Sequence, residues 1–206
     1  MIATKSRSGW GRKAVVLVAL ALLGACSQPQ LPKDNYYRLQ AAMPQPQDKG
    51  KLLFSDGIEV ERFVADGLVA SRPIVYSDAN KPNQVHEYHY HMWTEPPVVM
   101  VRDQLVDYLR EAGIADRIVT PELRGNARYA LIGKIKRLEK IVGSQPRAIL
   151  ELELGLLEDR TGKLVFLDSY RIDQAAASGS VGDAVIALNQ GLSEIFARFV
   201  ADLRAL

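Results

Sequence analysis

The chain has a single cysteine, Cys26, which closes a short apolar run near the N-terminus. Only basic charges precede this run, residues 14–23, and it is too short to cross a bilayer comfortably. A basic segment, an apolar segment and small residues before a cut site are typical of a secretory signal peptide. Residues 23–26 read LGAC and look like a bacterial lipobox, with the cut between Ala25 and Cys26. Lipidation would consume the only thiol, so the exported domain must fold without a disulfide.

The predicted modification of Cys26 would attach several acyl chains, such as palmitate, to the new N-terminus. Two or more chains anchor a protein stably, because each buried methylene contributes about 0.8 kcal/mol. The remaining chain therefore needs no transmembrane helix. Residue 27 is Ser, whereas an Asp at that position usually retains a Gram-negative lipoprotein in the inner membrane. The sequence thus predicts a lipid-anchored protein on the periplasmic face of the outer membrane.

Cleavage also changes the composition of the protein. Residues 1–25 form the predicted signal peptide, 26–34 the lipidated N-terminus and tether, and 35–206 one domain. Four of the 26 basic residues are lost with the signal peptide, which leaves 22 basic against 24 acidic side chains, a net charge of −2. This balance does not indicate a nucleic-acid partner.

Several stretches of the domain carry strand patterns. Residues 147–158 alternate most clearly, with leucines on one side and Glu151 and Glu153 on the other. Residues 127–142 begin with the same period and then change phase, which predicts a bulge near Lys136. Turn residues between neighbouring strands predict two hairpins. The other predicted strands cover residues 35–39, 57–64, 73–77, 84–92 and 164–172.

Two segments carry helical patterns. The first is predicted to start near Thr94, with Thr94 as its N-cap, and to end at Gly113. The second covers residues 182–206 behind Ser180, and its apolar residues repeat at three- and four-residue steps. The order strands, helix, strands, helix predicts an α+β fold: a mainly antiparallel β-sheet with two amphipathic helices packed on one face.

The three histidines all lie on the strand predicted at residues 84–92. Side chains alternate along a strand, so Glu87, His89 and His91 are expected to share one face. A set of two histidines and a carboxylate is a weak candidate for a zinc or iron site. Neighbouring ligands on one strand rarely close such a site, and no HxxxH or CxxC motif supplies more. An exposed strand rich in rings is the simpler interpretation, and we predict neither a bound metal nor a cofactor.

Catalytic motifs are also missing from the sequence. There is no G-x-S-x-G elbow, no thiol after lipidation and no glycine-rich loop before a helix. Glu151 and Glu153 are expected on the wet face of their strand. The basic residues Lys134, Lys136, Arg137 and Lys140 are interpreted as part of a solvated sheet face, with lipid headgroups or an acidic partner as the alternative. The sequence therefore predicts a protein that is not an enzyme.

Three short stretches follow the lipobox in a specific order. They read NYYRL at residues 35–39, SRPIVYS at 71–77 and WTEPP at 93–97, where the last opens a helix. In this order they resemble the ABC-type transport auxiliary lipoproteins, the group that includes paraquat-inducible protein C. The resemblance covers residues 36–203. One departure is Met92, where members commonly carry Arg or Lys.

The resemblance implies a non-catalytic subunit of an Mce-type ABC lipid-transport system that supports membrane integrity. Such a lipoprotein would dock the periplasmic Mce-domain substrate-binding protein at the outer membrane, in a system with an ABC permease and ATPase. The aromatic residues Tyr88, Tyr90 and Trp93, together with His91, are candidates for the partner contact. His89 and the hairpin partner at residues 73–77 belong to the same surface. A homo-oligomer around the conduit is compatible with this role, although the sequence specifies no subunit number.

Two other functions fit the same sequence. One is an outer-membrane assembly lipoprotein, or pilotin, for a secretin or a β-barrel. The other is a periplasmic metal-binding lipoprotein, which depends on Glu87, His89 and His91 acting together. Neither the transported molecule nor its direction of movement can be read from the sequence.

Overall fold

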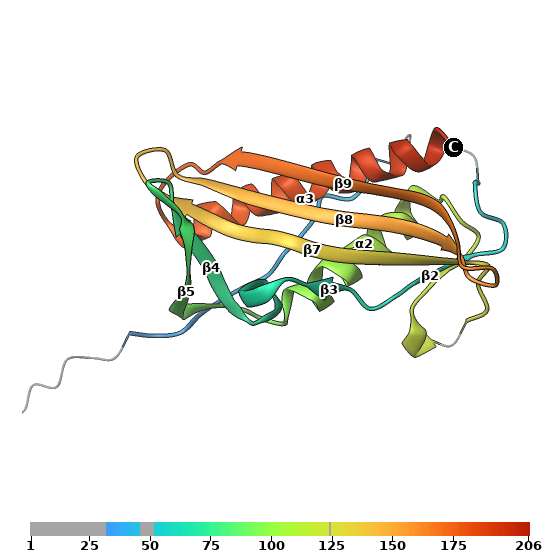
Figure 1. The fold of residues 1–206 in the computed structure, drawn as a ribbon, viewed down its shortest axis with the longest axis horizontal. Coiled ribbons are helices and arrows are strands. Elements are labelled where there is room, and N and C mark those ends of the chain that lie inside the picture. Colours follow the sequence, from blue (N-terminus) through green and yellow to red (C-terminus); the bar gives the residue numbers. More distant parts are fainter. Residues whose placement is uncertain (1–31, 46–51, 124) are drawn as a thin grey trace, which may run out of the picture. The chain divides into compact units, whose positions relative to one another are not determined.

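Three long antiparallel strands form the largest part of the β-sheet (Figure 1). They are β7 (Tyr129–Val142), β8 (Arg147–Glu158) and β9 (Lys163–Ala175). The alternation predicted for β8 is confirmed: its leucines from Leu150 to Leu156 are at most 1% exposed. The register between β7 and β8 shifts between Ile135 and Arg137, which confirms the bulge predicted at Lys136.

The structure is a computed structural model that describes residues 32–45, 52–123 and 125–206. Ala25, Cys26 and the rest of the predicted signal peptide lie outside the described residues. The predictions for the cleavage site and the lipid anchor are therefore not tested by the fold.

A second hairpin extends the sheet beyond β7. It consists of β4 (Pro73–Asp78) and β5 (Lys81–Trp93), and β4 runs parallel to the end of β7. Four short strands add parallel pairings at the margins. These are β1 (Asn35–Tyr37), β2 (Ile58–Val60), β3 (Val64–Ala65) and β6 (Ile118–Val119). The long pairings are antiparallel, and the predicted α+β class is confirmed. The short parallel pairings were not predicted, because two or three residues carry no period of their own.

Helix α2 (Pro97–Ala112) begins later than predicted. Its N-cap is Pro96, which makes no side-chain cap hydrogen bond, so the prediction of Thr94 as the cap is wrong. The reason is that Pro96 and Pro97 suit the entry and first turn of the helix, where no donor is lost. At the other end Gly113 adopts φ 62°, the left-handed conformation that the sequence predicted.

Helix α3 (Val181–Arg204) begins as the sequence predicted. The side chain of Ser180 accepts a hydrogen bond from the backbone N–H of Asp183 at 3.0 Å. The length and composition of α3 would suit a membrane span, but 56% of its apolar window is buried inside the protein. In this structure α3 is a core helix.

Ser180→Ala is expected to lower the free energy of unfolding by about 1 kcal/mol, because an N–H of the first helical turn loses its acceptor. Chemical denaturation followed by circular dichroism measures this change. Ser144→Ala, in an exposed turn, is the matched control and should change stability by less than about 0.5 kcal/mol. Equal effects of the two substitutions would contradict the capping role.

The core lies between the sheet and the two helices. Helix α3 packs on β8 and β9, and α2 packs against α3, so both helices cover one face as predicted (Figure 1). Tyr170 is 1% exposed and donates its phenol hydrogen to Asp202 Oδ2 at 2.6 Å. Burial, followed by this hydrogen bond, raises the pKa of Tyr170, so the phenol stays neutral. The bulkiest fully buried side chains are Trp93, Tyr170, Phe196 and Phe199.

An extended segment after β1 crosses both helices. The backbone N–H groups of Gln40, Ala41 and Ala42 donate to the side chains of Asn189, Gln104 and Ser193, respectively, at 2.8–2.9 Å. Leu39, beside them, is only 3% exposed. The N-terminal arm of the domain is therefore bound through its backbone, directly after the predicted tether.

Candidate interaction surface

The ring-rich strand β5 contains a wide bulge. Pro73 of β4 pairs with Met92 of β5, and Val75 of β4 pairs with Glu87 of β5. An advance of two residues along β4 therefore corresponds to five residues along β5. Extra residues on one strand interrupt the alternation of side chains between the two faces. The period-2 rule that the sequence suggested for residues 84–92 therefore fails between Glu87 and Met92.

Five rings lie together beside the bulge, and we name them the ring cluster. Tyr76 lies 4.4 Å from Tyr88 between ring centroids, and Tyr88 lies 5.2 Å from His91. The phenol of Tyr37 is 2.8 Å from Nδ1 of His91. Partial burial, followed by the electrostatic effect of Tyr88, raises the pKa of Tyr37, so its hydroxyl stays protonated at neutral pH. The members of the cluster are Tyr37, Tyr76, His86, Tyr88 and His91.

Lys140 joins the ring cluster from β7. It is 4% exposed, and its Nζ donates to Tyr88 Oη at 3.1 Å and to the carbonyl of Gly179 at 2.5 Å. The interpretation of Lys140 as part of a solvated face is therefore wrong. Two features explain the error. The bulge at Lys136 changes the alternation of β7, so that Lys140 points to the face covered by the helices, and the loop before α3 then covers this end of the strand. The ammonium group fastens that loop to the ring cluster.

The weak candidates for metal ligands are not brought together. Glu87 accepts a hydrogen bond from Ser71 Oγ at 2.7 Å, whereas His91 contacts Tyr37 and Tyr88. His89 is exposed, and its ring centroid lies 6.5 Å from that of Tyr90. The expectation that Glu87, His89 and His91 share a face is wrong, because the bulge turns His91 away. No group of three or more His, Cys, Asp or Glu within the described ranges is arranged to hold a metal ion.

The predicted partner-contact residues differ in accessibility. Tyr90 is 39% exposed, and Tyr88 and His91 are half-buried in the ring cluster. Trp93 is 1% exposed and packs in the core, so its assignment to a contact surface is corrected. A tryptophan at the junction of a strand and a helix satisfies its large apolar area by burial.

Strand β5 also has an open edge, which the sequence did not predict. β1 covers only the three residues 91–93, and residues 81–90 have β4 as their only partner strand in the described part of the chain. Residues 81–86 are all exposed. An open edge offers unpaired N–H and C=O groups to an extended segment of a partner. The ring cluster and this edge together form the candidate interaction surface.

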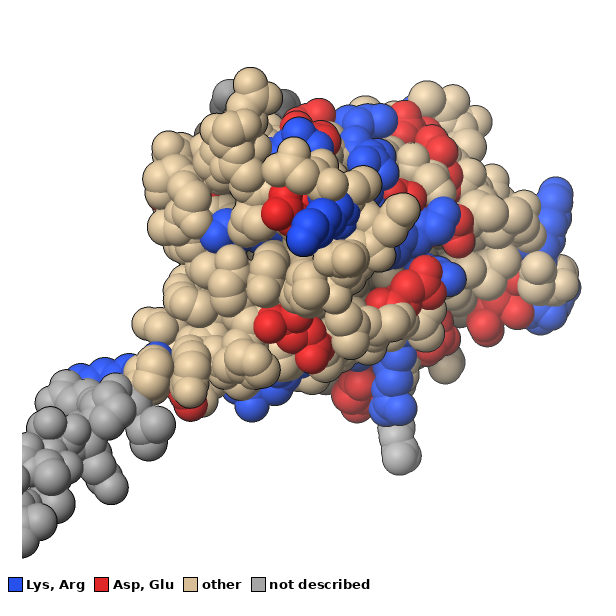
Figure 2. Space-filling view, turned by 60° about the vertical axis from the view of Figure 1, so that its left-hand side comes forward, with Lys and Arg blue, Asp and Glu red and all other residues tan. Residues whose placement is uncertain are grey.

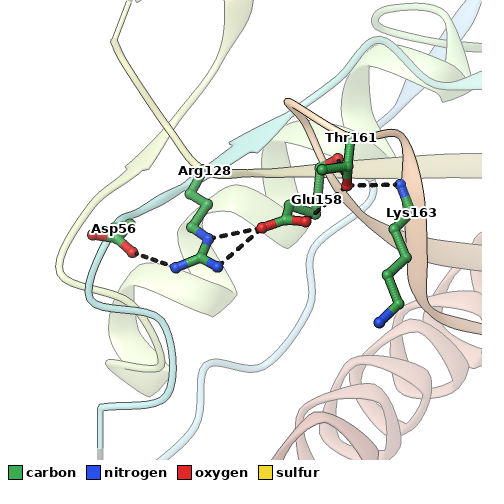
Figure 3. Close-up of polar contacts among 5 residues, drawn as sticks. All are labelled: Asp56, Arg128, Glu158, Thr161 and Lys163. Atoms are coloured by element: carbon green, nitrogen blue, oxygen red, sulfur yellow. Dashed lines mark hydrogen bonds and ion pairs between the residues drawn. The ribbon is translucent and has the colours of Figure 1, made fainter.

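At the other end of the sheet, charged residues fasten the strands to one another (Figure 3). Arg128 contacts Asp56 at 3.2 Å and Glu158 at 2.9 Å, and Thr161 donates to the same glutamate. The hydrogen bonds from Thr161 and Arg128 lower the pKa of Glu158. Asp56, Arg128 and Glu158 line part of a polar pocket of about 630 Å³. Asp56 and Glu158 each already have a hydrogen-bonding partner, so these charged residues are best explained as stabilising the fold at this end of the sheet.

Charges of both signs are mixed on the face shown in Figure 2. Glu151 pairs with Arg171 at 3.1 Å, and Lys136 pairs with Glu153 at 3.1 Å, both across the sheet. These carboxylates occupy the wet side of β8, as predicted. No extended basic area is visible on this face, which fits the near balance of 22 basic and 24 acidic side chains in residues 26–206.

The domain is an α+β sheet with an open edge beside the ring cluster, and in the sequence it follows the predicted lipobox. The sequence model of the family described as the ABC-type transport auxiliary lipoprotein component matches residues 37–200. The chain belongs to this family, so it is an auxiliary lipoprotein of the bacterial cell envelope, and the resemblance read from the sequence is confirmed.

Solved structures share the fold. Protein XCC0632 from Xanthomonas campestris has 20% sequence identity and a TM-score of 0.69, over 81% of this chain and 92% of that chain. An uncharacterised protein has 16% identity and a TM-score of 0.64, over 84% and 99%. None of the curated proteins compared with the chain matches it.

Proposed function

We propose that this lipoprotein is the outer-membrane subunit of an Mce-type ABC lipid-transport system. It docks the periplasmic Mce-domain substrate-binding protein at the outer membrane and acts without catalysis. The observation that carries the proposal is the family match over residues 37–200, which begins shortly after the lipobox at Cys26. Ser27 supports sorting to the outer membrane rather than retention in the inner membrane.

The candidate interaction surface supports docking through β5. Its open edge supplies main-chain hydrogen-bonding groups, and Tyr90 adds an exposed ring beside the half-buried Tyr88 and His91. Aromatic residues are enriched at protein interfaces because they bury a large area with few rotatable bonds. In this proposal the rings orient the partner and the strand edge holds it.

Affinity purification of the full lipidated protein from cross-linked envelopes tests the proposed function. Mass spectrometry is expected to identify an Mce-domain protein together with an ABC permease and ATPase. Recovery of a secretin or a β-barrel protein alone would overturn the proposal in favour of an assembly role.

The double variant Tyr90→Ala/His91→Ala is expected to reduce recovery of the Mce-domain protein about tenfold, which corresponds to about 1.4 kcal/mol of binding free energy. Leu164→Ala on β9 is the control, because that leucine is 48% exposed on a strand distant from β5 in the pairing order. Circular dichroism checks that each variant remains folded. Unchanged recovery with the folded double variant would exclude this part of β5 as the contact.

A further inference from the structure

A pocket of about 550 Å³ lies on the sheet face opposite the helices, between the β4–β5 hairpin and the turn of residues 67–70. Val75 forms part of its apolar lining and is consecutive with Ile74, which points into the core. Because successive strand residues point to opposite faces, Val75 faces away from the helices. The volume is within the range of small-molecule sites, about 300–1,000 Å³.

The wall of this pocket has a polar part, formed by Asp66, Asn83, Lys136, Arg137 and Glu139, and an apolar part that is incompletely covered. Leu68 is 42% exposed on one side and Val85 is 47% exposed on the other, with Val69, Val75 and Pro82 between them. Leaving apolar area in water costs about 25 cal/mol per Å², so an apolar ligand would gain free energy by covering these two side chains.

Two cationic side chains from β7 also line the pocket. At the bulge, Ile135 pairs with Leu152 and Arg137 pairs with Glu151, which leaves Lys136 as the extra residue. Lys136 nevertheless reaches Glu153 on the wet face at 3.1 Å, so the bulge directs two consecutive cations to one side of the sheet. Each of these side chains remains 33% exposed. A regular strand would have sent one of them into the core.

We infer that this pocket, which we name the bulge pocket, binds a phosphate-bearing lipid. The acyl chain lies between Leu68 and Val85, and the phosphate contacts Lys136 and Arg137. Two carboxylates also line the pocket, and each already has a partner: Glu139 is bound by Arg137 and by Ser77, and Asp66 is bound by Lys134 at 2.9 Å. Charge repulsion of the phosphate is therefore reduced at the pocket. The inference deepens the proposed function and rests on it for the lipid-transport context.

Photo-crosslinking of the full-length protein in growing cells tests the bulge pocket. Val85 is replaced by p-benzoylphenylalanine, the lipids are labelled with radioactive phosphate, and the purified protein is examined after irradiation. A second position is Leu68, on the opposite wall. Both are partly exposed, so the bulky probe is compatible with folding. The control is Leu167, which is 51% exposed on β9 and remote from the pocket.

The expected result is a phospholipase-sensitive radioactive band with the probe at Val85 or Leu68 and little with the probe at Leu167. Adding Lys136→Gln should lower the Val85 signal about threefold, the effect of one partly exposed charge contact. Lys163→Gln is the control, since Lys163 is an exposed lysine on β9, does not line the pocket and lies on a strand paired only with β8 among the described strands.

Equal labelling at all three probe positions, or none at Val85 and Leu68, would overturn the inference. A crosslink to a protein instead of a lipid would also overturn it and assign the pocket to a protein segment. Purification of the unsubstituted protein, without a probe on β5, separates this result from the proposed function. If the Mce-domain protein is recovered but no lipid is crosslinked, lipid binding in the bulge pocket is rejected and the docking role stands. If lipid is crosslinked but the Mce-domain protein is not recovered, the docking role is rejected and lipid binding stands.

Discussion

Cys26→Ala is expected to abolish palmitate labelling and to remove the protein from the outer-membrane fraction. Alanine has no thiol to accept a diacylglycerol group, and without several buried acyl chains the membrane affinity of the exported chain is lost. Growth with radioactive palmitate, followed by separation of the two membranes on a density gradient, measures both effects. The loss of label should be complete.

Ser27→Asp is the matched control for this experiment. Its cysteine is intact, so palmitate labelling should remain at the level of the unmodified protein. If residue 27 directs sorting, the labelled protein should now be found with the inner membrane. A Cys26→Ala protein that still incorporates palmitate would show that the lipobox has been misassigned.

Gly133→Ala is expected to lower the free energy of unfolding by about 2–3 kcal/mol, at the upper end of the usual cost of overpacking a core. A Cβ at residue 133 would lie 2.4 Å from Cζ of Phe63 and 2.5 Å from Cε1. Phe63 is 6% exposed, so the ring has little free space to move into. Glycine is therefore needed on β7 to let the ring pack directly on the backbone. Urea denaturation measures the change.

Gly155→Ala tests the same substitution on the neighbouring strand. Its Cβ would lie 3.1 Å from Ile132 Cγ1 and 3.2 Å from Leu167 Cδ1, two partly exposed side chains that can move. The expected cost is less than about 1 kcal/mol. The double variant Gly133→Ala/Phe63→Leu should be less destabilised than the sum of its single variants by about 1 kcal/mol. Strict additivity would show that Phe63 is not the cause.

The bulge pocket overlaps the open edge of β5, where Pro82, Asn83 and Val85 line it, but it does not include the ring cluster. Lys140 contacts Tyr88 of the ring cluster and the carbonyl of Gly179, whereas Lys136 and Arg137 line the bulge pocket. Partner docking and lipid binding can therefore be tested by separate substitutions.

The sequence by itself determined the features that depend on local order. Alternation in residues 147–158 predicted β8, a change of phase predicted the bulge at Lys136, and Ser180 and Gly113 marked helix ends. Each is encoded within a few neighbouring residues, where period and capping act directly.

Only the tertiary structure decided which side chains meet. The bulge in β5 separated His91 from Glu87 and placed it beside Tyr88, and the loop before α3 buried Lys140, which had been interpreted as solvated. The open edge of β5 and the bulge pocket likewise arise from strands distant in sequence. A one-residue change of register reverses the faces of all later side chains, and register is set by cross-strand packing, which no local pattern contains.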